Sequence, residues 1–269
     1  MFTSPSPSSQ PAPFPTAQGR PARDEILVQL QKQLRRWEET KRPTTVCSST
    51  GCAELDRLFP GGGVSRGTLV EWLAEDVGSG AMWLALVVAR EACHGGGPLL
   101  VIDGRGTFYP PAAARAGVDL ERLIVVRPAT ARDETWALDQ SLRCPGLGAV
   151  LCVTDRLRQR AARRLQLAAE ASGGVGLLVR PASVRSEPCW AEVRLLVEPR
   201  AGTAGRRLEV ELLKTRGTVA SELAGSSELI GPSAVGKGRL TLEIDDETGL
   251  VRAVARLAAP AAQRRSSGA

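Results

Sequence analysis

The sequence predicts an α/β fold, in which a mostly parallel sheet is flanked by helices and carries an antiparallel hairpin at its edge. Strand-like apolar runs alternate with helical runs from Thr50 to Pro181, which is typical of a parallel sheet covered by helices. Alternating segments without helices between them follow, as expected for antiparallel strands. The chain has 269 residues, 43% of them hydrophobic, which suffices for one sizeable domain with tails.

The runs also predict the order of the elements. We expect strand 67–73, helix 81–92, strand 99–103, helix 111–116, strand 124–127, helix 133–143, strand 149–155, helix 157–172 and strand 176–180. Segments 190–198 and 207–214 then predict the edge hairpin, with Gly202 and Gly205 in its turn. A terminal hairpin is expected within 240–257.

The two ends of the chain differ in composition from this core. Residues 1–22 are rich in Pro, Ser and Ala, which predicts a disordered tail. Residues 23–42 carry apolar side chains at helical spacing and predict an N-terminal amphipathic helix. The core domain is expected over 46–258, and residues 259–269 are expected to form a second disordered tail.

Charge and cysteine usage restrict the class of protein. The formal net charge of +6 permits contact with nucleic acid or an acidic protein surface without demonstrating it. No apolar run approaches the roughly 20 residues of a spanning helix, and no secretion signal pattern begins the chain. We therefore expect a cytoplasmic protein without a membrane partner. The six cysteines form no CxxC pair and His94 is the sole histidine, so we expect no metal site.

The turn after the first core strand lies where open α/β sheets bind phosphate. A phosphate-binding loop of the form GxxxxGK[ST] needs a lysine for the phosphates and a hydroxyl group for Mg²⁺. When this turn is aligned on Gly80, Glu75 replaces the first glycine, Ala81 the lysine and Met82 the hydroxyl residue. We therefore expect poor ATP binding and no cofactor. Alternatively, Gly78, Ser79 and Gly80 form a tight strand-to-helix turn and nothing more.

Three groups of residues resemble the RecA recombinase family over about residues 50–220. The first is TGCAELD at 50–56 with GGGVSRG at 61–67, and the second is VID at 101–103, YP at 109–110 and AGVDLERL at 116–123. The third, RRLQLAAE at 163–170 with LLVRP at 177–181, resembles the ImuA type, the RecA-related member of a bacterial mutagenesis cassette. The resemblance implies a RecA-like P-loop NTPase core.

Several positions depart from what the resemblance implies. Arg105 stands where RecA has its catalytic glutamate, so a water-activating carboxylate is absent there. Thr154 stands where the second metal-side aspartate is expected, and Asp155 comes one residue late. A register error of one residue would leave Asp155 as a remnant of that carboxylate. Both segments that match the DNA-contacting loops of RecA are short, which argues against filament-type DNA binding.

Two groups of basic residues are candidate contact sites. Arg156, Arg160 and Arg163 are spaced to share one face of the helix expected over 157–172; this face contacts a nucleic acid or an acidic partner, or is simply solvated. Lys214 and Arg216 match a Lys-x-Lys pair with which one RecA protomer reaches the ATP of its neighbour. The hypothesis is that this pair contacts a RecA filament; the alternative is two exposed charges at a strand end.

These observations favour a non-catalytic accessory factor in DNA-damage-induced translesion synthesis, within the SOS response, that works by protein contacts. The resemblance implies three partners: RecA, an ImuB-type Y-family-like polymerase protein and an error-prone replicative polymerase. Contact with DNA is expected to be weak or indirect. Two alternatives stay open. The first is an active RecA-like DNA-dependent ATPase, and the second is a SulA-like inhibitor of cell division.

Overall fold

The computed structural model describes residues 46–75, 78–202, 205–215, 218–219, 238–245 and 247–254. Contacts divide the chain into Met1–Thr44 and Thr45–Ala269, and every described residue belongs to the second unit. The predicted tails and the predicted amphipathic helix at 23–42 lie outside the described residues.

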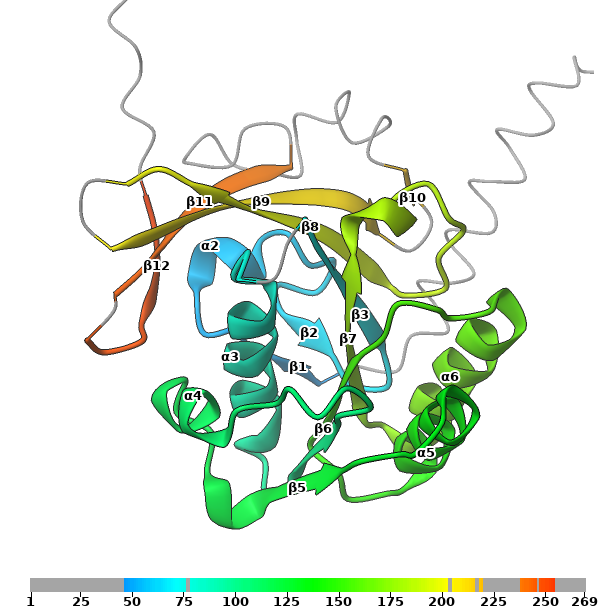
Figure 1. The fold of residues 1–269 in the computed structure, drawn as a ribbon. Helices are drawn as coiled ribbons and strands as arrows, with labels where there is room; N and C mark the ends of the chain where they lie inside the picture. Colours follow the sequence, from blue (N-terminus) through cyan, green and yellow to red (C-terminus); the bar gives the residue numbers. More distant parts are fainter. Residues whose placement is uncertain are drawn as a thin grey trace, which may run out of the picture. The chain divides into compact units, whose positions relative to one another are not determined.

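One sheet of ten strands organises the described part of the second unit (Figure 1). Its order is β12-β11-β9-β8-β3-β7-β6-β4-β5, and β10 pairs with β9. The strands are β3 (Leu69–Ala74), β4 (Leu99–Ile102), β5 (Leu123–Val126), β6 (Ala149–Val153), β7 (Val175–Pro181), β8 (Val193–Arg200), β9 (Arg206–Thr215), β10 (Thr218–Val219), β11 (Arg239–Ile244) and β12 (Val251–Ala253). Neighbours from β8 to β5 are parallel, and all other pairs in the sheet are antiparallel.

The predicted helices are present, with ends close to the expected ones. They are α3 (Ala81–Cys93), α4 (Pro110–Arg115), α5 (Ala131–Arg143) and α6 (Gln159–Ser172). The structure adds short elements without a periodic signal: α2 (Ala53–Asp56), the antiparallel pair β1 (Cys47–Ser48) and β2 (Val64–Ser65), and the 3-10 turns η1 (Leu120–Arg122) and η2 (Ala182–Val184). The α/β fold with a mostly parallel, helix-flanked sheet is therefore confirmed.

Alternation along the strands divides the core between the two faces of the sheet. On β3, Val70 and Trp72 pack in the cluster that contains α3, whereas Leu69 packs in the cluster that contains α5 and α6. Figure 1 shows α3 lying apart from the α5–α6 pair. Because side chains of a strand point alternately to opposite faces, these strands must be apolar on both sides. This explains their nearly continuous apolar runs.

The antiparallel hairpin of β8 and β9 is present, but the prediction that it forms the edge of the sheet was wrong. Strand β8 pairs in parallel with β3, and β9 pairs with β11, so β12 takes that edge. The physical reason is the terminal hairpin, which was predicted and is present as β11 and β12. Leu240, Leu242 and Ile244 of β11 are buried in the α3-side core and extend the sheet past β9.

Candidate functional site

The turn aligned with the phosphate-binding loop lies between β3 and α3, at the carboxyl end of a parallel strand. Glu75 is exposed at the end of β3, and Asp76 lies outside the described residues. Gly78 and Gly80 have φ values of 95° and 91°, in the left-handed region that favours glycine. Gly80 is the N-cap of α3 and offers no side-chain cap. The backbone thus makes a glycine turn into a helix N-terminus, as such loops do.

Two side chains of this turn, those of Ser79 and Ala81, point into the protein. Ser79 and Ala81 are buried, and the Ser79 hydroxyl accepts a 3.5 Å hydrogen bond from the amide of Ala81. A Cβ atom on Gly80 would come within 2.5 Å of Leu208 Cδ1, so β9 packs directly on the turn. The residue at the lysine position of the motif is therefore a buried methyl group, next to the glycine on which Leu208 packs.

Met82, at the hydroxyl position of the motif, is half-buried, and it lines a pocket. This pocket of about 150 Å³ is also lined by residues from the ends of β4 and β6 and from α4. The pocket walls are Leu86, Val101, Ile102, Asp103, Thr107, Phe108, Tyr109, Ala112 and Val153. In this lining Asp103 is the one carboxylate. The pocket is mostly apolar where a nucleotide site would need groups that bind Mg²⁺ and phosphate.

Asp103 uses its oxygens to shape the loop that follows β4. It accepts hydrogen bonds from the amides of Thr107 at 2.9 Å and Phe108 at 3.2 Å. Its Oδ2 atom also lies 3.4 Å from Nε of Arg127. A carboxylate bonded to two backbone amides and a guanidinium is a structural cap for the loop.

Arg105 and Asp155, the late carboxylate next to Thr154, contact each other. Arg105 forms an ion pair with Asp155, and both side chains are about half exposed. Strand β6 ends at Val153, and Thr154 is buried, with its amide donating to the Val179 carbonyl at 3.0 Å. Thr154 therefore continues the pairing of β6 with β7, and Asp155 lies beyond the strand, where it neutralises Arg105.

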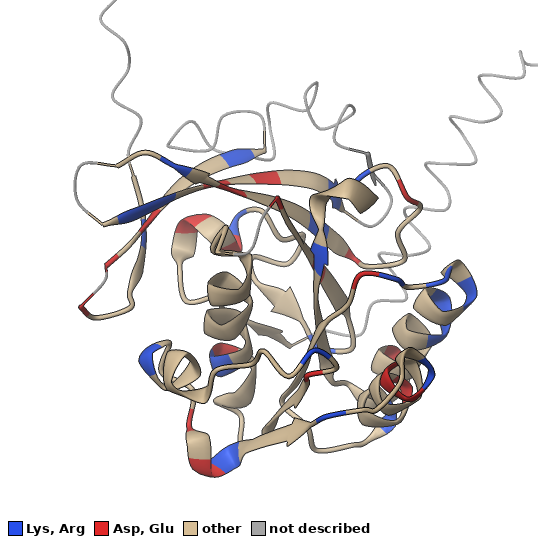
Figure 2. Cartoon of the chain, viewed as in Figure 1, with Lys and Arg blue, Asp and Glu red and all other residues tan. Residues whose placement is uncertain are grey.

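The predicted basic helix face is only partly present. Helix α6 begins at Gln159 with Arg158 as N-cap, so Arg156 lies in the preceding loop and does not share a helix face with Arg160 and Arg163. The helix prediction failed here because an apolar residue, Leu157, precedes the helix and packs into the core from the loop. Figure 2 shows Lys and Arg positions gathered near the start of α6. The guanidinium of Arg163 lies over the ring of Trp190, 5.2 Å from its centroid.

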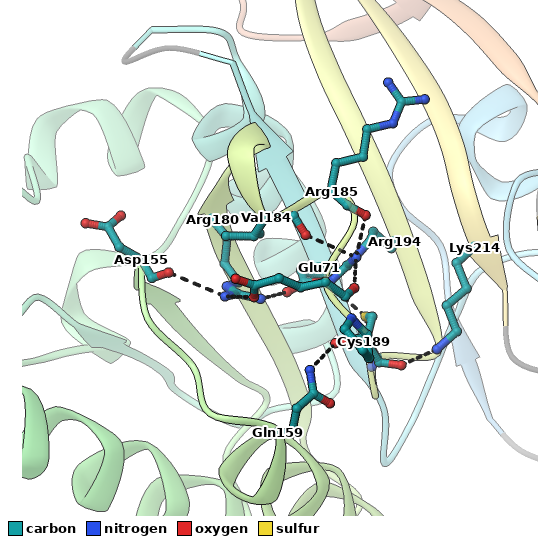
Figure 3. Close-up of polar contacts among 12 residues, drawn as sticks. Glu71, Asp155, Gln159, Arg180, Val184, Arg185, Cys189, Arg194 and Lys214 are labelled. Carbon is teal, nitrogen blue, oxygen red and sulfur yellow. Dashed lines mark hydrogen bonds and ion pairs between the residues drawn. The ribbon is translucent and has the colours of Figure 1, made fainter.

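Lys214 lies at the end of β9, as predicted, and is half-buried. Its ammonium donates a hydrogen bond to the Cys189 carbonyl (Figure 3). Arg216, the other member of the predicted basic pair, lies outside the described residues. The ammonium of Lys214 therefore reaches toward the loop that precedes β8.

A buried ionic cluster that sequence reasoning missed underlies that same loop (Figure 3). Glu71 of β3 accepts from Arg180 of β7 at 2.8 Å and from Arg194 of β8 at 2.5 Å, and all three side chains are nearly inaccessible. Burial opposes ionisation of Glu71, but the charge of Arg194 and the hydrogen bonds from Arg180 and Arg194 lower its pKa. A signal was present: a charged residue stands within or next to the apolar run of each of these neighbouring strands.

The cluster fixes the loop between β7 and β8. Arg194 donates to the carbonyls of Glu187 at 2.7 Å and Arg185 at 3.0 Å, and Arg180 pairs with the Glu187 carboxylate at 3.1 Å. The thiol of Cys189 donates to Glu71 at 3.0 Å. Burial and the charge of Glu71 raise the pKa of Cys189 to about 11, so this thiol stays protonated at neutral pH.

Two further findings concern metal binding and membrane-spanning helices. Among the described residues, no three His, Cys, Asp or Glu side chains come together as a metal site would require. In the same residues, every helix is too short or too polar to cross a membrane.

Comparison with known proteins gives partial matches, and no family model matches the chain. Protein RecA of Rhodopirellula baltica is 34% identical over 94 residues, which is 35% of this chain and 25% of the relative. Protein RecA of Clostridium botulinum (strain Eklund 17B / Type B) is 42% identical over 82 residues, or 30% of this chain and 23% of the relative. Protein ImuA of Caulobacter vibrioides (strain NA1000 / CB15N) is 29% identical over 145 residues. That match covers 52% of this chain and 59% of the relative.

The mostly parallel sheet flanked by helices is consistent with a RecA-like core, and these partial matches support the same class of protein. The chain spans about a quarter of these RecA relatives and somewhat over half of ImuA. Within the RecA-like class, the similarity to Protein ImuA supports an ImuA-type member.

Proposed function

We propose that this chain is a non-catalytic accessory factor of the response to DNA damage, which acts by protein contacts during translesion synthesis. Similarity to RecA and ImuA supports a RecA-like role related to DNA damage. The non-catalytic part rests on one observation: a buried alanine, Ala81, stands where the phosphate-binding loop needs its lysine. The apolar lining around Met82 and the Arg105–Asp155 pair support the same conclusion.

In this proposal the chain contacts RecA, and its RecA-like core serves as a binding surface. Lys214 and Arg216 meet anionic groups on RecA, where each cation contributes a charge-assisted hydrogen bond. Association with an ImuB-type polymerase protein and an error-prone replicative polymerase completes the proposed assembly. Contact with DNA is indirect, since the segments between β6 and α6 and between β7 and β8 are short.

The experiment measures binding of the full chain to RecA filaments formed on single-stranded DNA with a non-hydrolysable ATP analogue. We expect saturable binding that weakens about 10-fold or more in the Lys214→Ala, Arg216→Ala double variant, since two charge-assisted contacts are lost. Unchanged binding in that variant would contradict the role of the basic pair. Hydrolysis of ATP by the purified chain, stimulated by single-stranded DNA, would contradict the non-catalytic function and favour the ATPase alternative.

A further inference from the structure

A groove of about 310 Å³ lies between α6, the loop that precedes β8, and the end of β9, outside the positions aligned with the nucleotide site. We call it the α6–β9 groove. It is lined by Gln159, Gln166, Pro188, Cys189, Trp190, Ala191 and Lys214. Gln159 and Gln166 are seven positions apart on α6, so at about 1.5 Å per residue this wall is roughly 10 Å long. An extended peptide of about three residues spans that length.

Two cations border this groove: Lys214 lines it, and Arg163 lies over the ring of its lining residue Trp190. Arg163 lies on the same face of α6 as Gln159 and Gln166, and its guanidinium is placed over Trp190. Lys214 comes from β9 and uses one of its three donors on the Cys189 carbonyl. No carboxylate within the described residues lies at ion-pair distance from Arg163 or Lys214. The groove therefore presents positive charge that the described part of the chain does not neutralise.

An apolar surface separates these charges. Trp190 is 42% exposed, and Pro188 is exposed beside it. A large exposed aromatic side chain next to cations is typical of the central anchors of protein interfaces. Since one face of the Trp190 ring already contacts Arg163, the guanidinium is held with its donors available for a carboxylate.

The amide groups of the two glutamines that line the groove are already used. Gln159 Nε2 donates to the Pro188 carbonyl at 2.7 Å. Gln166 accepts from the Leu69 amide at 3.2 Å and donates to Glu170 at 3.0 Å. The two glutamine amides are thus not free to read base edges, and the chemistry left open here is two cations around an aromatic ring. These cations complement the carboxylates of an acidic peptide, and the oligo(dT) arm of the test below decides between that peptide and a nucleic acid.

The groove is also held in one shape before any partner binds. The loop that forms its wall is fixed by the Arg194 contacts to the Glu187 and Arg185 carbonyls (Figure 3). Gln159 and Lys214 tie the same loop to α6 and β9. A preformed groove binds an extended segment with less loss of conformational entropy than a loose one.

We propose that the α6–β9 groove binds an acidic, extended segment of a partner protein, with carboxylates on Arg163 and Lys214 and an apolar side chain on Trp190. The proposal rests on the proposed function, in which the chain works through protein contacts. The groove proposal specifies which chemical groups make one of these protein contacts.

The test uses fluorescence anisotropy of a labelled hexapeptide of alternating Asp and Leu, titrated with the full chain. We expect binding at low salt, and binding about 10-fold weaker for the matched peptide with Asn in place of Asp. Arg163→Ala and Lys214→Ala are each expected to weaken binding about 5-fold or more. Arg132→Ala, which removes an exposed arginine of α5 away from the groove, is expected to leave binding unchanged.

Three outcomes would overturn the proposal. One is equal affinity for the Asp and Asn peptides, and another is an equal loss in Arg132→Ala and Arg163→Ala. The third is that a 20-nucleotide oligo(dT) binds through Arg163 and Lys214 while the Asp peptide does not, which would make the groove a nucleic-acid site. If the peptide binds through Arg163 and Lys214 but the chain does not bind RecA, the groove proposal holds and the proposed RecA contact fails.

Discussion

Glu71 is a carboxylate in the middle of a buried strand, with a guanidinium group on each neighbouring strand. Arg180 and Arg194 carry two positive charges into the interior, and Glu71 contacts both. A buried charge without a partner costs far more than an exposed one, so the three side chains depend on one another. Together they hold the loop that carries Cys189 and Trp190 (Figure 3).

Replacing Glu71 by Gln keeps the shape of the side chain but leaves the buried Arg194 without a counter-charge and Arg180 with only the partly exposed Glu187. We expect the Glu71→Gln variant to lose about 3 kcal/mol of the free energy of unfolding, because breaking a buried ion pair typically costs about 3–5 kcal/mol. Urea unfolding at pH 7 measures this loss of unfolding free energy. Glu121→Gln, which changes an exposed carboxylate in η1, is the control and should stay within about 0.5 kcal/mol of the parent chain. A loss below about 1 kcal/mol in Glu71→Gln would contradict this account.

The same carboxylate makes stability depend on pH in a defined direction. The pKa of Glu71 is lowered from its ordinary value of 4.5 in the folded chain, so the ionised form favours folding. Its contribution is fully present above pH 4.5 and is lost as the pH falls toward the lower folded-state pKa. We therefore expect the difference in unfolding free energy between parent and Glu71→Gln to be constant from about pH 7 to 5.5 and to shrink below about pH 4.5. A constant difference down to about pH 3 would contradict the lowered pKa.

At the scale of elements, the N-terminus of α3 is covered by a strand. Leu208 of β9 lies against Gly80, and Gly249 of the β11–β12 turn lies close to Trp83 of α3. A strand that packs on this turn adds apolar contacts where a phosphate group would need open backbone amides. The contact between β9 and α3 therefore contributes to the stability of the fold, and it supports a binding role over a catalytic one.

A double-mutant cycle tests that contact. We expect Gly80→Ala to cost about 2–3 kcal/mol, since φ of 91° strains an alanine and its Cβ would overlap Leu208. Leu208→Ala leaves a cavity and should cost about 2–5 kcal/mol by itself. The double variant should cost about 1–2 kcal/mol less than the sum, because the overlap disappears. Additive costs in chemical denaturation would show that Leu208 does not press on Gly80.

At the scale of the whole molecule, the sequence predicts elements better than it predicts their neighbours. The strands and helices of the parallel core were predictable because the apolar residues of a strand, as in 69–74, follow a different pattern from those of a helix, as in 81–93. The position of the β8–β9 hairpin inside the sheet was not predictable. The alternation of Leu240, Leu242 and Ile244 indicates that β11 has a buried face, but it does not say that β9 is the strand beside it. Likewise, Arg163 on Trp190 and Lys214 on Cys189 join residues at least 25 positions apart, and no local pattern reports such contacts.

The terminal strands provide the last prediction, because they extend one sheet well past the parallel core. Leu240, Leu242 and Ile244 are at most 1% exposed and belong to the α3-side core. Burying each such side chain contributes about 1.5–3 kcal/mol, so removing all three costs roughly 5–9 kcal/mol. That is comparable with the total stability of about 5–15 kcal/mol of a typical domain.

We therefore expect a chain that ends after Thr215 to lose cooperative thermal unfolding and the dispersed amide signals of its NMR spectrum. A chain that ends after Val254 keeps every described strand and is the matched control, with both signals expected to persist. Without β11, strand β9 would also expose unpaired backbone groups and the apolar side chains of Leu208 and Val210, which promotes aggregation. If the shorter chain instead unfolds cooperatively at nearly the parent temperature, β11 and β12 are a separable addition. The β8–β9 hairpin would then be sufficient as the edge of the sheet.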